Sequence, residues 1–286
     1  MNGVKTALLL GLLSGILLFV GQMFGGSQGL MLGLILAIGL NFFSYFFSEK
    51  MALSMYHAQP VTPQENAHIY ARVAPMMQNL VQQMAIPMPR LWVIPDQSPN
   101  AFATGRNPRH SSVAMTEGLL TLMNDRELEG VLAHELGHVK NRDILTSSVA
   151  ATLAAALTHL AYMAMWFGGG TRGDDDEGGP GPLGGILMIF LAPMAAGLIQ
   201  MAISRTREYS ADASAARYTG SPDGLIGALR KLEKGVQRVP MDANPATAHM
   251  FIFPPILSGM SRLFSTHPPL EARIANLEAQ RFVGVR

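Results

Sequence analysis

Two histidines four positions apart, with a glutamate beside the first, form the chemically most informative pattern in the chain. They are His134, Glu135 and His138 in "HELGH". On an α-helix of 3.6 residues per turn, both imidazoles project from one face and can converge on a single metal ion. Glu135 lies about 100° around such a helix from His134, where it can reach a metal-bound water without being a ligand. H-E-x-x-H is the zinc metalloprotease pattern, in which this glutamate is the general base. The alternative is an exposed histidine pair.

A catalytic zinc site needs a third protein ligand and keeps its fourth position open for water. The chain contains no cysteine, so this ligand must be His, Asp or Glu. We choose Glu208, the first residue of "EYSADA"; the alternative is a surface carboxylate paired with Arg205 or Arg207. Asp212 follows one helical turn later and is expected to accept a hydrogen bond from the second nitrogen of a ligand histidine. Two histidines and a carboxylate also bind iron in some oxygenases, but the H-E-x-x-H spacing favours zinc.

The composition is not that of an ordinary soluble protein. Hydrophobic residues make up 49% of the 286 residues and charged residues only 14%, against about 25% charged in typical soluble domains. The net charge of +1 and the scattered basic residues argue against a nucleic-acid partner. The lack of cysteine excludes disulfides and fits a reducing compartment.

Long apolar segments predict four transmembrane helices, because about 20 apolar residues suffice to span a bilayer. The spans are expected near Ala7–Phe24, Leu30–Phe47, Ile144–Phe167 and Leu183–Ser204. A turn at Gly25–Gly29 joins the first two, and an acidic, glycine-rich loop over residues 168–185 joins the last two. The alternatives are a cleaved signal peptide for the first segment and a buried helical hairpin for the later pair.

Basic residues give the expected orientation. Nearly all of the 21 Lys and Arg residues lie in 49–143 and 205–286, so the positive-inside rule places both segments in the cytoplasm. Residues 1–48 then form a transmembrane hairpin, 49–143 the first half of a cytoplasmic domain, 144–204 a second transmembrane hairpin, and 205–286 the second half. The second hairpin returns "HELGH" and Glu208 to the same membrane face.

Local patterns in the polar segments predict a mixed α+β domain with a small edge sheet. "QENAHIYARVAPMMQNLVQQMAI" reads as an amphipathic helix ending before Pro87, and "RLWVI" and "SSVAMT" read as strands. Asn124 and Glu127 form a capping box for the "HELGH" helix. Residues 240–265, rich in Pro and Met, are interpreted as a cover over the cleft or as a loop packed on the domain or on lipid. The fold class is therefore mainly α: four transmembrane helices plus this cytoplasmic domain.

Two further roles require residues from elsewhere in the chain. A tetrahedral oxyanion needs a second positive or hydrogen-bonding partner, for which His267 and Arg217 are the candidates. An extended peptide substrate can add to a sheet edge, which Asn100, Ala101 and Phe102 in "NAFATG" could supply. The alternative for "NAFATG" is an ordinary loop with Phe102 buried.

The motifs "HELGHVKNRD", "REYSADA", "NAFATG" and "THPPLEARI", set among four apolar spans, resemble the bacterial HtpX-type membrane zinc metalloproteases. These belong to a gluzincin group together with the CAAX prenyl proteases, and the resemblance covers essentially the whole chain. It implies one zinc ion held by His134, His138 and Glu208, with Glu135 as the catalytic residue.

The same resemblance implies an endopeptidase of the bacterial inner membrane with its active site in the cytoplasm. Its substrates would be misfolded or damaged membrane proteins, and other quality-control proteases would be its partners. Two rival functions stay open: a zinc-binding membrane scaffold without proteolysis, and a prenyl-protein-type protease of narrow specificity.

Overall fold

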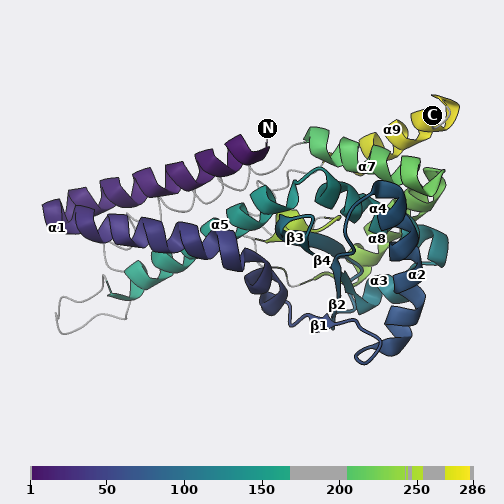
Figure 1. The fold of residues 1–286 in the computed structure, drawn as a ribbon, viewed down its shortest axis with the longest axis horizontal. Coiled ribbons are helices and arrows are strands. Elements are labelled where there is room, and N and C mark those ends of the chain that lie inside the picture. Colours follow the sequence, from purple (N-terminus) through teal and green to yellow (C-terminus); the bar gives the residue numbers. More distant parts are fainter. Residues whose placement is uncertain (1, 168–204, 242, 244–246, 254–267, 284–286) are drawn as a thin grey trace.

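The computed structural model describes residues 2–167, 205–241, 243, 247–253 and 268–283. A bundle of long apolar helices extends from one side of a mixed α/β domain (Figure 1). The elements are α1 (Asn2–Met55), β1 (Gln59–Pro60), α2 (Ala67–Met84), β2 (Arg90–Ile94), β3 (Ala101–Asn107), β4 (His110–Thr116), α3 (Glu117–Leu122), α4 (Asp125–Lys140), α5 (Ile144–Phe167), α7 (Arg205–Thr219), α8 (Asp223–Arg238), η1 (Ala248–Met250) and α9 (Leu270–Val283).

Helix α1 is a hairpin of two helical arms. The chain reverses at Gly26, whose φ of 55° and ψ of −138° suit glycine and fall within the expected turn. The arms approach so closely that a Cβ on Gly21 would lie 2.2 Å from the carbonyl oxygen of Gly29. Helix α5 packs against this hairpin through a buried apolar cluster and a 3.1 Å contact between the hydroxyls of Thr6 and Thr146.

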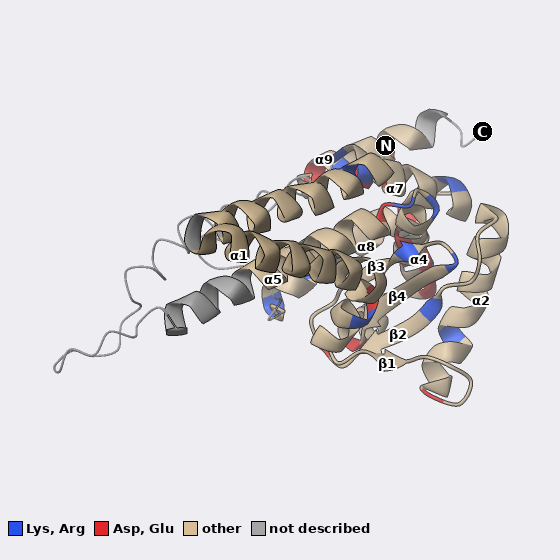
Figure 2. Ribbon diagram, turned by 60° about the vertical axis from the view of Figure 1, so that its left-hand side comes forward, with Lys and Arg blue, Asp and Glu red and all other residues tan. Residues whose placement is uncertain are grey.

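The outer surface of these helices is apolar. Val4, Phe19 and Ile38 are more than 60% exposed, and hardly any charge lies along α1 or α5 (Figure 2). Among the described residues, Gly25–Met55 is long and apolar enough to cross a membrane, while Gly3–Phe19 and Ile144–Leu157 are apolar but shorter. The expected loop 168–185 and the whole of the expected span Leu183–Ser204 lie outside the described residues. A membrane helix is thus present, and the full set of four spans remains a prediction.

The domain contains a four-stranded sheet in the order β1-β2-β4-β3. Strand β2 pairs with β4 in parallel, whereas the β1–β2 and β3–β4 pairs are antiparallel. The strands expected at "RLWVI" and "SSVAMT" are confirmed as β2 and β4. "NAFATG" forms most of β3, which lies at one edge of the sheet.

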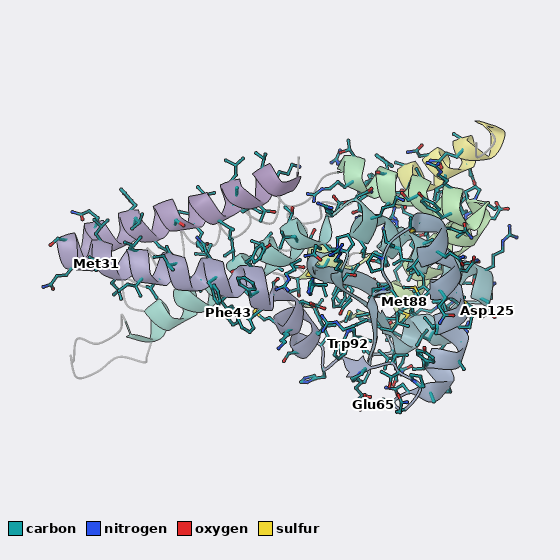
Figure 3. The ribbon with its side chains drawn as sticks, viewed as in Figure 1. Met31, Phe43, Glu65, Met88, Trp92 and Asp125 are labelled. Carbon is teal, nitrogen blue, oxygen red and sulfur yellow. The ribbon has the colours of Figure 1, made fainter. Side chains whose placement is uncertain are left out.

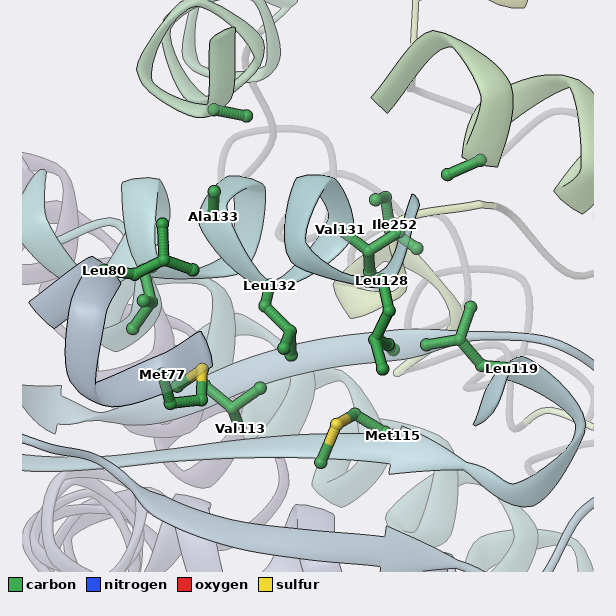
Figure 4. Packing of buried hydrophobic residues seen from close by; sticks show 14 of the residues in the cluster. Met77, Leu80, Val113, Met115, Leu119, Leu128, Val131, Leu132, Ala133 and Ile252 are labelled. Carbon is green, nitrogen blue, oxygen red and sulfur yellow. The ribbon is translucent and has the colours of Figure 1, made fainter. Parts of the chain in front are cut away.

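Helices α2 and α4 cover the sheet and build the main core. Helix α4 begins with the expected capping box, in which Asn124 and Glu127 bond each other's backbone N–H groups. Its Leu132 points toward Val113 of β4, beside Met77 of α2 (Figure 4). The amphipathic helix expected before Pro87 is confirmed as α2. Because α4 lies over β3 and β4, the "HELGH" residues sit close to the edge strand.

Helices α7, α8 and α9 pack on the domain around α4. Gly137 permits the close approach of α7: a Cβ at this position would lie 3.1 Å from the Cα of Ala211. Met31 lies at the tip of the α1 hairpin, and Asp125 lies at the opposite end of the molecule, on the far side of the domain (Figure 3). The metal-ligand candidates lie between these ends.

Candidate metal centre

Three side chains from two helices converge at the contact between α4 and α7. Nε2 of His134 lies 3.3 Å from Nε2 of His138, and the Glu208 carboxylate oxygens lie 3.5 Å from the His138 nitrogen and 3.7 Å from the His134 nitrogen. Ligand atoms about 2.0–2.2 Å from one tetrahedral zinc ion are separated by about 3.3–3.6 Å. The spacing of this set therefore fits a single bound zinc ion.

Burial argues against the two alternative interpretations, an exposed histidine pair and a surface carboxylate. His134 is fully buried and Glu208 is 7% exposed, so they are neither an exposed histidine nor a surface carboxylate. The Glu208 carboxylate faces the two histidines. Two buried donors and the half-buried His138, brought together in this way, favour a shared cation.

Each histidine is oriented by an aspartate on its other ring nitrogen. Nδ1 of His134 lies 2.9 Å from Asp212, where the predicted role of Asp212 requires it, and Nδ1 of His138 lies 3.2 Å from Asp143. An N–H donated from each Nδ1 leaves the Nε2 lone pair directed at the metal position. The Asp143 partner was not anticipated, although it closes the motif "HVKNRD".

Arg273 is a further residue that sequence reasoning missed. It is 2% exposed, and its guanidinium donates two hydrogen bonds to Asp212 at 2.9 and 2.6 Å and a third to the Ile252 carbonyl at 3.0 Å. A signal was present, because Arg273 falls three positions after Leu270 on the apolar stripe of the closing helix. An arginine on a buried face needs a buried acid.

Burial and charge set the protonation of this network. In the metal-free protein, burial lowers the pKa of His134, whereas Glu208 and Asp143 outweigh the burial of His138 and raise its pKa to about 9, so a metal would displace the Nε2 proton of His138. Burial alone would raise the pKa of Asp212, but Arg273 and the hydrogen bond from His134 hold it below its usual range. The Asp212 carboxylate is therefore ionised and can accept a hydrogen bond from Nδ1 of His134.

Glu135 lines the same cavity as the three candidate ligands and is not one of that group. It is 1% exposed, the backbone of Ala103 lies near its carboxylate, and its Oε1 makes no hydrogen bond within the described part of the chain. Burial raises its pKa to about 7, and the nearby charge of Glu208 acts in the same direction. A carboxylate tuned to this range can accept and return a proton near neutral pH.

A cavity at the metal position is closed on one side by residues 247–253, which we call the cover segment. The cavity is lined by Ala103, His134, Glu135, His138, Asp143, Ile144, Ser147, Glu208, His249, Met250, Phe251 and Ile252. The described part of 240–265 both lines the cavity and packs on the domain, so it fits the expected cover and the alternative of a packed loop alike. Because Ile144 and Ser147 begin α5, the cavity opens next to the apolar helices.

The cover segment lies along the edge strand β3. The amide of Ile252 donates to the Ala101 carbonyl at 3.0 Å, and the side chain of Asn100 exchanges two hydrogen bonds with the backbone of Phe253, at 2.8 and 3.3 Å. Phe102 is buried, as the alternative interpretation expected, with its ring 5.2 Å from that of Phe251. Asn100 and Ala101 thus sit beside the cavity, paired with the chain's own residues.

Of the two oxyanion candidates, only Arg217 falls within the described residues, and it lies away from the candidate metal site. Arg217 is exposed, its guanidinium lies over the Tyr218 ring at 5.6 Å, and it does not line the cavity. His267 lies outside the described residues. Arg207 is nearer the site: its guanidinium is buried without a hydrogen bond in the described part of the chain, 3.8 Å from Asp143.

The sequence is similar to those of known peptidases. Residues 63–281 match the family described as Peptidase family M48. The chain is similar to a "Protease HtpX homolog" from Desulforapulum autotrophicum (53% identity, 96% of this chain and 89% of that protein) and to one from Desulfatibacillum aliphaticivorans (54% identity, 98% and 90%). The solved structure of S. mikatae Ste24p aligns at 20% identity with a TM-score of 0.49, over 97% of this chain and 63% of that one.

Proposed function

The chain belongs to peptidase family M48 and is a membrane-associated metallopeptidase; on this premise we propose that it is a zinc endopeptidase. The observation that carries the proposal is the convergence of His134, His138 and Glu208 at ligand spacing, with the buried Glu135 beside them. Neither rival function, the scaffold or the prenyl-protein-type protease, is favoured by this family membership.

Glu135 is the proton carrier of the proposed reaction. A zinc ion bound by His134, His138 and Glu208 would supply Lewis acidity at the reacting groups. Glu135 takes a proton from the attacking water and later delivers it to the departing amine, a double role open to a buried carboxylate whose pKa is raised by burial. Asp212 and Asp143 keep His134 and His138 in the tautomer that directs Nε2 toward the metal.

We propose that the substrate binds in extended form along β3. The backbone of Ala103 contacts Glu135, so a strand paired with this edge would carry its scissile bond past the proton carrier. The Ala101 carbonyl, which such a strand would use, is bonded to Ile252 of the cover segment. A substrate strand would therefore have to displace the cover segment from the Ala101 carbonyl. An unfolded segment could do so more readily than a surface loop held in a stable fold. His267 remains our candidate for the oxyanion partner.

We further propose four spans with the active site facing the cytoplasm of a bacterium. The exposed apolar faces of α1 and the Lys and Arg residues of segments 49–143 and 205–286 support this orientation. The cavity next to the start of α5 would then meet polypeptide at the membrane border. Misfolded or damaged inner-membrane proteins are the proposed substrates, with other quality-control proteases as partners.

The test of the zinc endopeptidase uses purified full-length protein in detergent. We expect about one zinc ion per chain, cleavage of an unfolded protein that stops on chelation and returns with zinc, and loss of both metal and cleavage in Glu208→Gln. Glu278→Gln, which changes an exposed carboxylate paired with Arg230, should retain both. A Glu208→Gln variant with full zinc content and activity would overturn the ligand assignment.

The topology has a separate test, because the chain has no native cysteine. Single cysteines at Thr171, in the acidic loop, and at Gln82, in the domain, can be labelled in intact cells with an impermeant maleimide. Labelling of the first alone supports the proposed orientation. Labelling of Gln82→Cys before lysis would contradict it.

A further inference from the structure

A second hollow lies away from the metal, between the end of α1 and the β3–β4 hairpin. It measures about 300 Å³. Its lining includes Tyr45, Phe46, Phe47 and Lys50, all from α1, and Arg106 and His110 from the hairpin. Aromatic rings and cations thus line the same hollow. The peptidase chemistry uses none of these residues.

The position of the hollow matches a membrane interface. Phe42 and Phe46 are 58% and 45% exposed on the last apolar turns of the helix that can cross a membrane, and aromatic side chains favour the headgroup level. The Arg106 guanidinium lies 5.5 Å from the centre of the Phe46 ring, and the Lys50 ammonium 5.9 Å from that of Phe47. Both cations are therefore at the height of the aromatic residues.

The charge in the hollow is unbalanced. Its one carboxylate, Glu49, is paired with Arg90 and accepts a hydrogen bond from Ser112 at 2.5 Å. Within the described residues, Lys50 and Arg106 form no ion pair with any carboxylate, which leaves two positive charges beside an apolar, lipid-facing surface. An anion at that position would stabilise them, since surface cations are attracted to anionic lipid.

We propose that this hollow binds the phosphate headgroup of an anionic phospholipid, with the acyl chains along the exposed face of Phe42 and Phe46. The continuity of the cationic hollow with this apolar face favours a lipid over a soluble phosphate. Strand β3 runs from Ala101 beside the cover segment to the hairpin that carries Arg106. A bound headgroup would therefore fix the membrane-facing end of the strand that carries the proposed substrate edge. The lipid site depends on membrane embedding of α1 and not on the proposed zinc chemistry.

The test compares lipid binding by full-length protein in detergent, using native mass spectrometry with phosphatidylglycerol and phosphatidylcholine. We expect a preference for phosphatidylglycerol in the wild type. Each cation near an anionic surface contributes about fivefold to binding, so Lys50→Ala with Arg106→Ala should weaken phosphatidylglycerol binding by about 30-fold. A matched control, Arg230→Ala with Lys234→Ala, removes two cations from α8 and should bind as the wild type does.

Two further experiments separate the effect of charge from that of misfolding, and binding of a lipid from binding of soluble phosphate. Lys50→Arg with Arg106→Lys keeps the charge and should keep the preference, so it tests charge even if the alanine pair folds poorly. Equal binding of the two lipids by the wild type, or an unchanged preference in a folded alanine pair, would overturn the proposal. Displacement of phosphatidylglycerol by millimolar inorganic phosphate as effectively as by a short-chain phosphatidylglycerol would assign the site to a soluble phosphate and also overturn it.

Discussion

Replacing Arg273 by methionine should destabilise the domain more than any surface change. Arg273 and Asp212 are 2% and 0% exposed, and the arginine donates two hydrogen bonds to the carboxylate at 2.9 and 2.6 Å. Methionine fills much of the space but leaves the Asp212 charge buried without its cation. Removing one partner of a buried ion pair costs about 3–5 kcal/mol.

Loss of the Arg273–Asp212 ion pair should lower both the Tm and the affinity for metal. For domains of 150–250 residues, each kcal/mol corresponds to about 2–4 °C in Tm, so Arg273→Met should lower the Tm of the metal-free protein by about 6–20 °C. Asp212 orients His134, and loss of such support typically costs 10–100-fold in metal affinity. Thermal unfolding in detergent measures the first effect, and competition with a zinc chelator measures the second.

A double variant separates the buried charge from simple loss of packing. Asp212→Asn combined with Arg273→Met removes both charges, while the Asn carbonyl can still accept from His134. The double variant should therefore be at least as stable as Arg273→Met alone. Arg230→Met is the control, because its pair with Glu278 is exposed and worth about 0–1 kcal/mol. If the two losses add in the double variant, or if Arg273→Met unfolds like the control, the reasoning is refuted.

Other predictions test the helix contact, the cover segment and the metal. Gly137→Val should push α7 away from α4, because even a Cβ would lie 3.1 Å from the Ala211 Cα; we expect at least a roughly tenfold loss of zinc affinity, and unchanged affinity in chelator competition would contradict this. In an inactive Glu135→Gln protein, an added unfolded peptide should speed hydrogen exchange at the Ile252 amide, since the peptide replaces its bond to Ala101; slower exchange on binding would refute the proposed competition. Chelation of the wild type should lower its Tm and zinc should restore it, because a ligand bound only by the folded state stabilises that state; equal Tm values with and without zinc would argue against a zinc site.

The convergence of His134, His138 and Glu208 could be predicted because it follows from local periodicity and chain topology. His134 and His138 share a helix face by spacing alone, and Glu208 was assigned because an apolar hairpin returns the chain to the same place. Asp143 and Arg273 were missed, since their partners depend on tertiary packing. Arg217 could have been excluded from the sequence: it comes nine positions after Glu208, about 180° around the same helix.

The edge strand β3 also has features that the sequence could predict and a contact that it could not. The strand character of "NAFATG" is a local property, and the segment does form most of the edge strand β3. Its pairing with Ile252 joins residues some 150 positions apart, and no spacing rule predicts such a contact. The turn at Gly26, by contrast, follows directly from a glycine cluster between two apolar runs.

The central claim is that Glu135 moves protons and does not bind the metal. Wild type and Glu135→Gln should be purified in parallel, their zinc content measured, and cleavage of one unfolded protein followed for both. The account predicts about one zinc ion per chain in each and at least a 100-fold loss of cleavage in the variant, the contribution expected of a general acid–base catalyst. Equal cleavage by the two proteins, or loss of zinc from the variant, would contradict it.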